Sequence, residues 1–152
     1  MLKAIIVATT VALSIIALPS VALAAKPEIY TPAFSKVAVE GYDPVAYFTQ
    51  GKPVKGSEAF TTTYKGAEYR FSSAANLARF KTSPSTYSPQ FGGYCAWAIS
   101  QNYTAKGAAQ YWRVVNGKLY LNYNADVQKK WENNIPGFIA QANSNWPNVL
   151  EK

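Results

Sequence analysis

Thiol chemistry in this chain is limited to one residue, because the sequence contains a single cysteine, Cys95. Cys95 lies in an apolar and aromatic stretch, residues 91–98, that begins with Phe91 and two glycines. A thiol enzyme using Cys95 would need a lowered thiol pKa, which open backbone N–H groups after the glycines would favour. The alternative is a small core residue, because free cysteines are among the most buried residues and its neighbours are apolar. The sequence leaves both interpretations open.

Other catalytic chemistries find little support in the composition. The chain has no histidine, which excludes Ser-His-Asp and Cys-His nucleophile systems, His-ligated zinc and a histidine base. Its 8 Asp and Glu residues are dispersed, and no pair has a spacing typical of acid–base catalysis. One cysteine also excludes an internal disulfide and a cysteine-cluster metal site within one chain. We therefore expect a protein that binds rather than an enzyme.

Aromatic side chains are the next candidates for recognition. The chain has 11 Tyr, 4 Trp and 7 Phe, and the polar tips of Tyr and Trp suit ligand pockets and partner surfaces. Most of these rings should form the core. The exceptions are those beside glycines or in predicted loops: Tyr42, Tyr47, Tyr94, Trp97 and Tyr103.

The charge pattern argues against a nucleic-acid partner. The net charge is +7 and 15% of the residues are charged, but the basic residues are scattered and form no Arg-rich run. A mild positive charge of this kind favours solubility. The hydrophobic fraction of 49% and the aromatic content also indicate a folded chain rather than a disordered one.

Residues 1–24 have the layout of a secretory signal peptide. Lys3 gives a positive start, an apolar run follows over residues 4–18, and Pro19 precedes the small-x-small cleavage site at residues 22–24. The apolar run is shorter than the ~20 residues that span a bilayer. We expect a periplasmic or secreted protein without a transmembrane helix after cleavage.

The first half of the mature chain predicts a helical turn, a hairpin and a helix. Asp43 followed by proline is typical of an N-cap and first helical residue. Residues 60–71 alternate around a Lys-Gly turn and predict a hairpin, after which Ser72 or Ser73 caps a helix over residues 74–80. Residues 25–40, before these elements, are a lead-in without periodicity.

The second half contains a further hairpin. Asn116-Gly117 between alternating β-formers is a strong hairpin signal, and Asn124 can cap a helix that reaches Trp131. Pro136-Gly137 is expected to separate that helix from a helical piece over residues 138–143. No internal repeat stands out, and periodicity does not decide between helix and strand for residues 91–98. The order predicts an α+β fold of small antiparallel hairpins packed with short helices, in a single domain over residues 41–150.

The residues around the first hairpin resemble the YHS domain. The resemblance rests on Asp-Pro-Val from Asp43, the Tyr-Lys-Gly-x-x-Tyr-x-Phe-Ser-Ser hairpin from Tyr64, the helix ending in Phe80, and Pro84 and Tyr87. It covers residues 43–87, and the stretch over residues 92–150 looks like the extended, exported members of the family. The resemblance implies a core like that of YHS and TRASH domains.

The family is linked to metal handling, notably as appendages of copper-transporting ATPases. The resemblance therefore implies a metal-related binding module, but the cysteines of the metal-type version align with Ala46, Ser72 and Asn76, and its histidine with Arg70. Ser and Asn are poor ligands for soft metals. Cys95 remains as the candidate ligand for a thiophilic metal ion such as copper, with help from a second chain, a ligand or oxygen donors.

Three hypotheses follow from these observations. The first is an exported binding module of the YHS type for a metal ion or a small ligand. The second is an interaction or structural protein of the cell envelope, and the third is a thiol-dependent redox enzyme using Cys95. A homodimer through Cys95 is a further expectation. The ligand site of the first hypothesis comprises Cys95, Tyr94, Trp97, Asp43 and Tyr47.

Overall fold

A computed structural model describes residues 24–152, so the predicted signal peptide lies outside the described residues except for Ala24. Short helices and two antiparallel hairpins make up the fold, which confirms the α+β prediction. The α-helices are α1 (Ala46–Thr49), α2 (Ala74–Thr82), α3 (Pro84–Tyr87), α4 (Ala96–Ser100), α5 (Ala125–Glu132) and α6 (Ile135–Asn145). The strands are β1 (Ser57–Tyr64), β2 (Ala67–Phe71), β3 (Ala108–Val115) and β4 (Lys118–Asn122). The 3-10 helices are η1 (Ala38–Gly41), η2 (Gln90–Gly93) and η3 (Asn148–Glu151). No helix among the described residues has both the length and the apolar character needed to cross a membrane.

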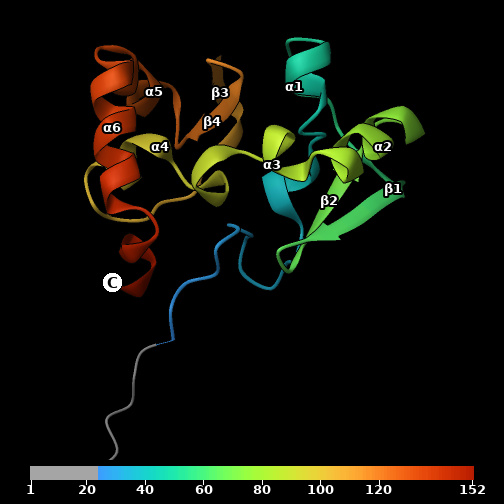
Figure 1. Cartoon of the computed structure of the whole chain (residues 1–152), viewed down its shortest axis with the longest axis horizontal. Coiled ribbons are helices and arrows are strands. Elements are labelled where there is room, and N and C mark those ends of the chain that lie inside the picture. Colours follow the sequence, from blue (N-terminus) through green and yellow to red (C-terminus); the bar gives the residue numbers. More distant parts are fainter. Residues whose placement is uncertain (1–23) are drawn as a thin grey trace, which may run out of the picture.

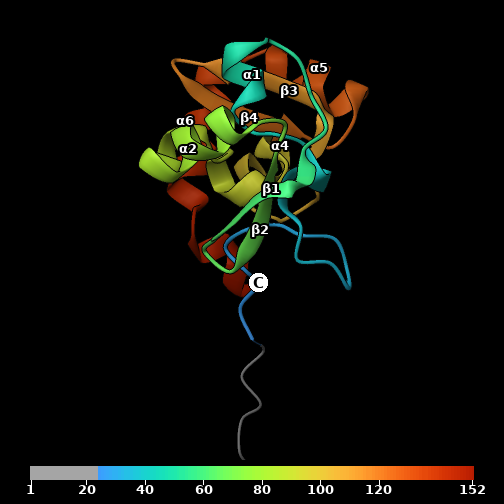
Figure 2. The ribbon, with the colours of Figure 1, turned by 90° about the vertical axis from the view of Figure 1, so that its right-hand side faces the viewer.

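The two hairpins belong to two halves that lie side by side. In Figure 1 the elements from α1 to α3 lie on one side and those from α4 to α6, which end in red, on the other. Figure 2 views the molecule from the side of β1, β2 and α2. Each half therefore carries its own hairpin together with helices that follow and precede it in the chain.

The halves repeat one arrangement of elements. In the first unit, residues 38–82, η1, α1, the β1–β2 hairpin and α2 follow one another. In the second unit, residues 90–132, the order is η2, α4, the β3–β4 hairpin and α5. Both hairpins have a register shift near the start of their first strand. The fold thus contains a structural repeat that no sequence pattern indicated.

Backbone hydrogen bonds confirm the correspondence between the units. The N–H of Asp43 donates to the carbonyl of Val54 at 2.8 Å, and the N–H of Cys95 donates to Ala105 at 2.9 Å. The antiparallel bridges beside these bonds join Tyr42 to Lys55 and Tyr94 to Lys106. Cys95 is therefore the counterpart of Asp43.

Glycine allows the same close approach in both units. A Cβ on Gly56 would lie 2.6 Å from the Cβ of Arg70, and one on Gly107 would lie 2.8 Å from the Cβ of Leu121, the counterpart of Arg70. No side chain fits at either place, because real Cβ contacts are longer than this. The two glycines mark the same crossing of the chain over itself.

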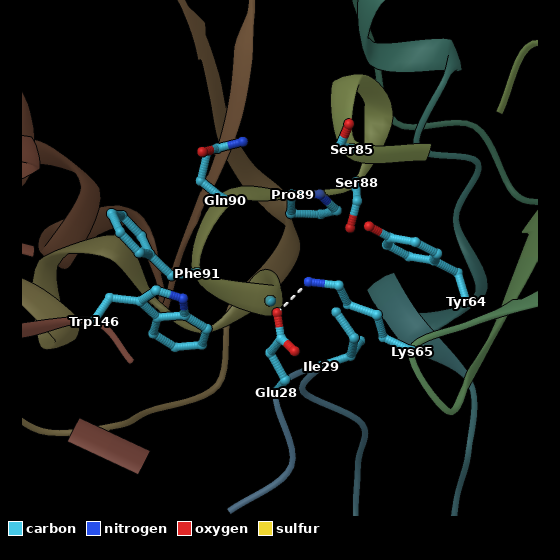
Figure 3. A pocket seen from close by; sticks show the side chains of 11 residues that line it. Glu28, Ile29, Tyr64, Lys65, Ser85, Ser88, Pro89, Gln90, Phe91 and Trp146 are labelled. Atoms are coloured by element: carbon cyan, nitrogen blue, oxygen red, sulfur yellow. Dashed lines mark hydrogen bonds and ion pairs between the residues drawn. The ribbon is translucent and has the colours of Figure 1, made fainter. Parts of the chain in front are cut away.

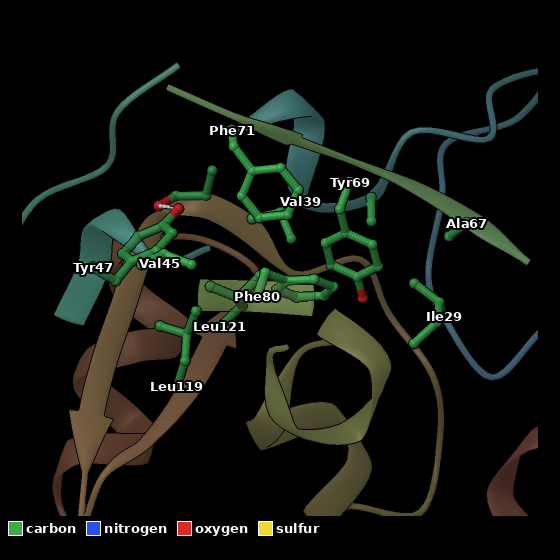
Figure 4. Packing of buried hydrophobic residues seen from close by; sticks show 12 residues of the cluster. Ile29, Val39, Val45, Tyr47, Ala67, Tyr69, Phe71, Phe80, Leu119 and Leu121 are labelled. Atoms are coloured by element: carbon green, nitrogen blue, oxygen red, sulfur yellow. Dashed lines mark hydrogen bonds between the residues drawn. The ribbon is translucent and has the colours of Figure 1, made fainter. Parts of the chain in front are cut away.

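The hydrophobic core joins the two units. Phe80 packs against Tyr69 and Phe71 with ring centroids 4.8 and 5.0 Å apart. Leu119 and Leu121 of β4 belong to the same buried cluster, as Figure 4 shows. A strand of the second unit therefore helps to fill the core of the first.

Most local predictions from the sequence are confirmed. The turns fall at Lys65-Gly66 and Asn116-Gly117, and the side chains of Ser73 and Asn124 cap α2 and α5. Residues 91–98 combine the end of η2, two residues in isolated β-bridges (Tyr94 and Cys95) and the start of α4.

The expected break at Pro136-Gly137 is wrong. Both residues lie in the first turn of α6, where proline is tolerated because its missing N–H has no intrahelical partner. The side chain of Asn134 accepts a hydrogen bond from the N–H of Gly137 and so caps this helix.

Candidate functional site

Asp43 is a buried carboxylate held by five hydrogen bonds. Its Oδ1 accepts from the N–H groups of Val45 at 2.9 Å and Ala46 at 3.3 Å. Its Oδ2 accepts from the N–H and Oγ–H of Ser72 at 2.8 and 2.7 Å, and from Nδ2 of Asn76 at 2.7 Å. These donors leave the carboxylate well satisfied, so Asp43 holds α1, the end of β2 and α2 together.

The Cys95 sulfur has the corresponding backbone surroundings in the second unit. Burial raises the pKa of the Cys95 thiol, and backbone N–H groups of Ala98, Tyr123 and Trp97 oppose that rise. The structural counterparts of these N–H groups are those of Val45, Ala46 and Ser72, which hold the Asp43 carboxylate. The Asp43 carboxylate accepts hydrogen bonds from all three of its N–H groups, whereas the N–H of Trp97 donates to the side chain of Asn122.

Asn122 supplies a side-chain amide beside the sulfur. The Cys95 thiol donates to Oδ1 of Asn122 at an Sγ–Oδ1 distance of 3.8 Å, and the N–H of Trp97 donates to the same oxygen at 3.3 Å. Asn122 is fully buried, yet its Nδ2 has no hydrogen-bond partner. The indole Nε1 of Trp131 is the other buried side-chain donor without a partner in the described part of the chain. Unpaired buried donors cost stability, so both are unusual.

A pocket of about 230 Å³ lies over the sulfur. Cys95 itself is fully buried, so it forms the floor of the pocket, while Tyr103 and Tyr123 are 46% and 43% exposed. The rings of Trp97 and Tyr103 meet edge to face with centroids 6.3 Å apart. We name this the Cys95 pocket; its lining residues are Cys95, Trp97, Ala98, Tyr103, Ala105, Tyr123 and Val127.

Two lysines lie over rings of the Cys95 pocket. The ammonium nitrogen of Lys130 is 5.6 Å from the centre of the Trp97 ring, and that of Lys106 is 5.4 Å from the centre of the Tyr123 ring. Cation–π attraction holds an ammonium group near an aromatic face. The pocket therefore combines an apolar aromatic lining with positive charge at its rings.

Comparison with known protein families matches residues 45–91 to the YHS domain. The match begins just after Asp43, takes in the rest of the first unit and α3, and ends within η2. Because most of the match lies in the first unit, we call that unit the YHS unit. A search of curated proteins and a search of solved structures each gave no match to the chain. The second unit thus repeats the fold of the YHS unit outside the matched range.

The metal that a YHS domain suggests does not fit the residues present. Ser72 and Asn76, at two of the family's cysteine positions, both donate to Asp43, and Ala46 at the third has no side-chain donor atom. Arg70, at the histidine position, forms ion pairs with glutamates. Over residues 24–152 no group of three or more His, Cys, Asp or Glu side chains is placed to hold a metal ion. Cys95 alone is too few ligands for a closed site.

Of the five predicted site residues, Cys95 and Trp97 line one pocket and the other three lie elsewhere. Asp43 is enclosed by its hydrogen bonds in the YHS unit. The hydroxyl of Tyr47 donates to the carbonyl of Ala109 at 2.9 Å. The hydroxyl of Tyr94 donates to Pro27 at 2.8 Å, and its ring packs on Tyr30 and Trp146. The hypothesis combined residues that follow the two glycines with residues of the first helical turn, but these two segments belong to different units.

Sequence reasoning missed part of the lining. Tyr103 stood out among the aromatic residues in predicted loops, and it does line the pocket. Tyr123 and Val127 were not singled out, because Tyr123 ends a predicted strand and Val127 lies in a predicted helix. Recognising the repeat would have found Tyr123, since its counterpart Ser72 lies in the YHS motif.

A second pocket, of about 210 Å³, lies between the lead-in, the turn of the first hairpin and η2 (Figure 3). Lys65 and Glu28 point toward each other across it and form an ion pair. The hydrogen bond with Glu28 raises the pKa of Lys65. Because this lysine is already paired, the pocket offers less free charge to a ligand than the Cys95 pocket.

Proposed function

We propose that the protein is an exported binding module of the YHS type that holds a small aromatic, negatively charged ligand in the Cys95 pocket. The observation that carries this proposal is the lining of that pocket: a buried thiol below the rings of Trp97, Tyr103 and Tyr123. Ligand sites are concave and mostly apolar, with a few polar groups that fix orientation. Export is proposed from residues 1–24, with the periplasm or the extracellular space as the location.

The size of the Cys95 pocket limits the ligand. A dry apolar cavity of roughly 150 Å³ binds benzene. The Cys95 pocket has about 230 Å³, which suits a fused two-ring system. The ammonium groups of Lys106 and Lys130 favour a carboxylate or a similar group on that ring system.

The state of the thiol favours binding over nucleophilic catalysis. Burial raises the pKa of Cys95, whereas thiol enzymes depend on a lowered one. At neutral pH the sulfur is therefore a neutral, polarisable surface under the rings. Such a surface suits contact with an aromatic ligand.

Indole-3-carboxylate is a suitable probe. We expect calorimetric titration of the purified protein to give a Kd of about 1 mM or lower, as the size of the probe allows. Val127→Phe fills the Cys95 pocket from α5 and should abolish this binding. Ile139→Phe is the matched control, because Ile139 lines a separate apolar groove with Val115 and Ile135.

The proposal fails if the probe does not bind, or if Val127→Phe and Ile139→Phe weaken it equally. Circular dichroism of both variants must first show that they are folded. Shifts in the ¹⁵N–¹H spectrum that include Trp97 and Tyr123 would place the probe in the Cys95 pocket.

A further inference from the structure

Two long segments of the chain carry no charged residue. Residues 82–105 and residues 133–150 contain no Asp, Glu, Lys, Arg or His, although 15% of the whole chain is charged. The first segment contains α4 and the second contains α6, and these two helices pack against each other (Figure 1). All side chains that α4 and α6 contribute to the surface are therefore uncharged.

The exposed side of α6 shows this most clearly. A surface helix usually presents charged side chains to solvent. The preceding helix, α5, does so with Asp126 and Lys129, whereas the exposed polar residues of α6 are Gln141, Asn143 and Ser144. A surface free of charge suits a neutral partner, because a charged side chain covered by such a partner loses hydration and gains no opposite charge.

A groove of about 590 Å³ lies between the end of α4 and α6. Its volume is within the range of about 300–1,000 Å³ that is typical of ligand clefts. Phe138 is the one aromatic residue of the lining, and the groove shares no lining residue with the Cys95 pocket. We name it the amide groove; its other lining residues are all polar and uncharged, namely Ser100, Gln101, Asn102, Gln141, Ser144 and Asn145.

Asn145 fixes the two walls of the amide groove relative to each other. Its Nδ2 donates to the carbonyl oxygens of Ile99 at 2.9 Å and Ser100 at 3.2 Å, which ties α6 to the end of α4. Asn102 and Gln141, on the two walls, are exposed, so their side-chain amides are accessible to a ligand. The groove therefore presents amide donors and acceptors from a fixed framework.

We propose that the amide groove binds a neutral oligosaccharide. Each sugar hydroxyl both donates and accepts hydrogen bonds, and a side-chain amide offers donors and acceptors to match. The ring of Phe138 provides an apolar surface for the C–H groups of a sugar ring. A protein partner fits less well, because the centre of a protein interface is more apolar than this lining. The site is distinct from the Cys95 pocket and does not depend on the ligand proposed there.

Titration of the ¹⁵N-labelled protein with chitotetraose and with cellotetraose tests the proposal. Both probes are neutral and rich in hydroxyl groups, and chitotetraose adds acetamide groups. We expect a Kd of about 1 mM or lower for at least one of them. The side-chain amide signals of Asn102 and Gln141 should shift, and the backbone signal of Tyr123 in the Cys95 pocket should not.

Substitutions on α6 separate the amide groove from the rest of the helix. Gln141→Ala removes an amide from the groove and should weaken binding by at least about fivefold. Phe138→Leu keeps an apolar side chain but removes the ring, and it should also weaken binding. Asn143→Ala is the matched control, because Asn143 is an exposed amide of the same helix that lines the separate apolar groove with Ile139. Its affinity should equal that of the wild type.

Salt dependence distinguishes a neutral ligand from one that is held by lysines. The Kd should change by less than about twofold between about 50 mM and 500 mM NaCl, because no charged group takes part. The inference is overturned if neither oligosaccharide binds at about 10 mM, if salt abolishes the binding, or if Asn143→Ala weakens it as much as Gln141→Ala. Gln141→Ala should leave the titration with indole-3-carboxylate unchanged, which keeps the two proposals apart.

Discussion

Asp43 and Cys95 occupy the same position in two units of the same fold, and each follows an equivalent backbone bridge. The carboxylate is saturated with hydrogen bonds inside the YHS unit. The thiol instead forms the floor of a pocket. One copy of the arrangement thus holds neighbouring elements together through its side chain, and the other borders a pocket.

Removing the charge of Asp43 should destabilise the protein strongly. Asp43→Asn directs an amide N–H₂ at donors from Ser72 and Asn76, and we expect a loss of about 3–5 kcal/mol in the free energy of unfolding. Urea unfolding measures this loss. Asp126→Asn, on an exposed residue of α5, is the control and should cost less than about 1 kcal/mol. Equal effects of the two substitutions would contradict the structural role of Asp43.

Replacing Gly56 or Gly107 by alanine should destabilise the protein to a similar extent. Gly56→Ala and Gly107→Ala each place a Cβ within 2.6 Å of neighbouring backbone atoms, and we expect each to cost about 3 kcal/mol. Gly66→Ala, with nothing within 4 Å of its Cβ but a φ of +80°, should cost about 1 kcal/mol. Thermal unfolding of the three variants compares them. A tolerated Gly107→Ala would show that the second unit does not repeat the crossing of the first.

Stability should fall at alkaline pH. Burial raises the pKa of Tyr69 to about 12 from 10.0, and its hydrogen bond with Ser88 opposes the rise. The Tyr69 hydroxyl keeps its proton to a higher pH in the folded state than in the unfolded state. Its contribution to the free energy of unfolding is therefore complete below pH 10 and is lost as pH rises toward 12. The loss amounts to about 3 kcal/mol.

Urea midpoints measured from neutral pH to about pH 12 test this dependence. Tyr69→Phe removes the ionising group and should make the decline shallower. Burial also raises the pKa of Tyr47, so a residual decline with the same sign is expected in that variant. A free energy of unfolding that increases between pH 10 and 12 would contradict the raised pKa of Tyr69.

The Cys95 thiol should react slowly, and its alkylation rate should keep rising with pH into the alkaline range. Because burial raises its pKa above 9.0, the rate of alkylation by iodoacetamide should still be rising at pH 9. Tyr103→Ala opens the Cys95 pocket and should increase the rate roughly tenfold at constant pH. Rates are followed by intact mass. A rate that levels off below pH 8 would mean that the pKa of the Cys95 thiol is lowered, and this result would favour the redox hypothesis.

A homodimer through Cys95 stays a prediction. The sulfur is fully buried, so a disulfide with a second chain requires the pocket to open first. Tyr103→Ala should therefore promote the dimer if it forms at all. Non-reducing electrophoresis of the wild type and this variant, with Cys95→Ser as the control, measures it.

Local structure could be read from the sequence because short-range chemistry decides it. The hairpin turns at Lys65-Gly66 and Asn116-Gly117 and the caps at Ser73 and Asn124 each depend on neighbouring residues. The YHS resemblance was also readable, because its motif is continuous along the first hairpin and is matched over residues 45–91. The break expected at Pro136 failed, because proline can equally begin a helix.

The sequence by itself determined that thiol chemistry rests on Cys95, that the family's metal ligands are replaced, and that two hairpins with capped helices form. The tertiary structure alone decided that Asp43 and Cys95 are counterparts and that Tyr103, Tyr123 and Val127 meet over the sulfur. The physical reason is that backbone hydrogen bonds preserve the repeat while its side chains differ. The residues that line a pocket come from separate elements, and their spacing along the chain does not indicate that they are in contact.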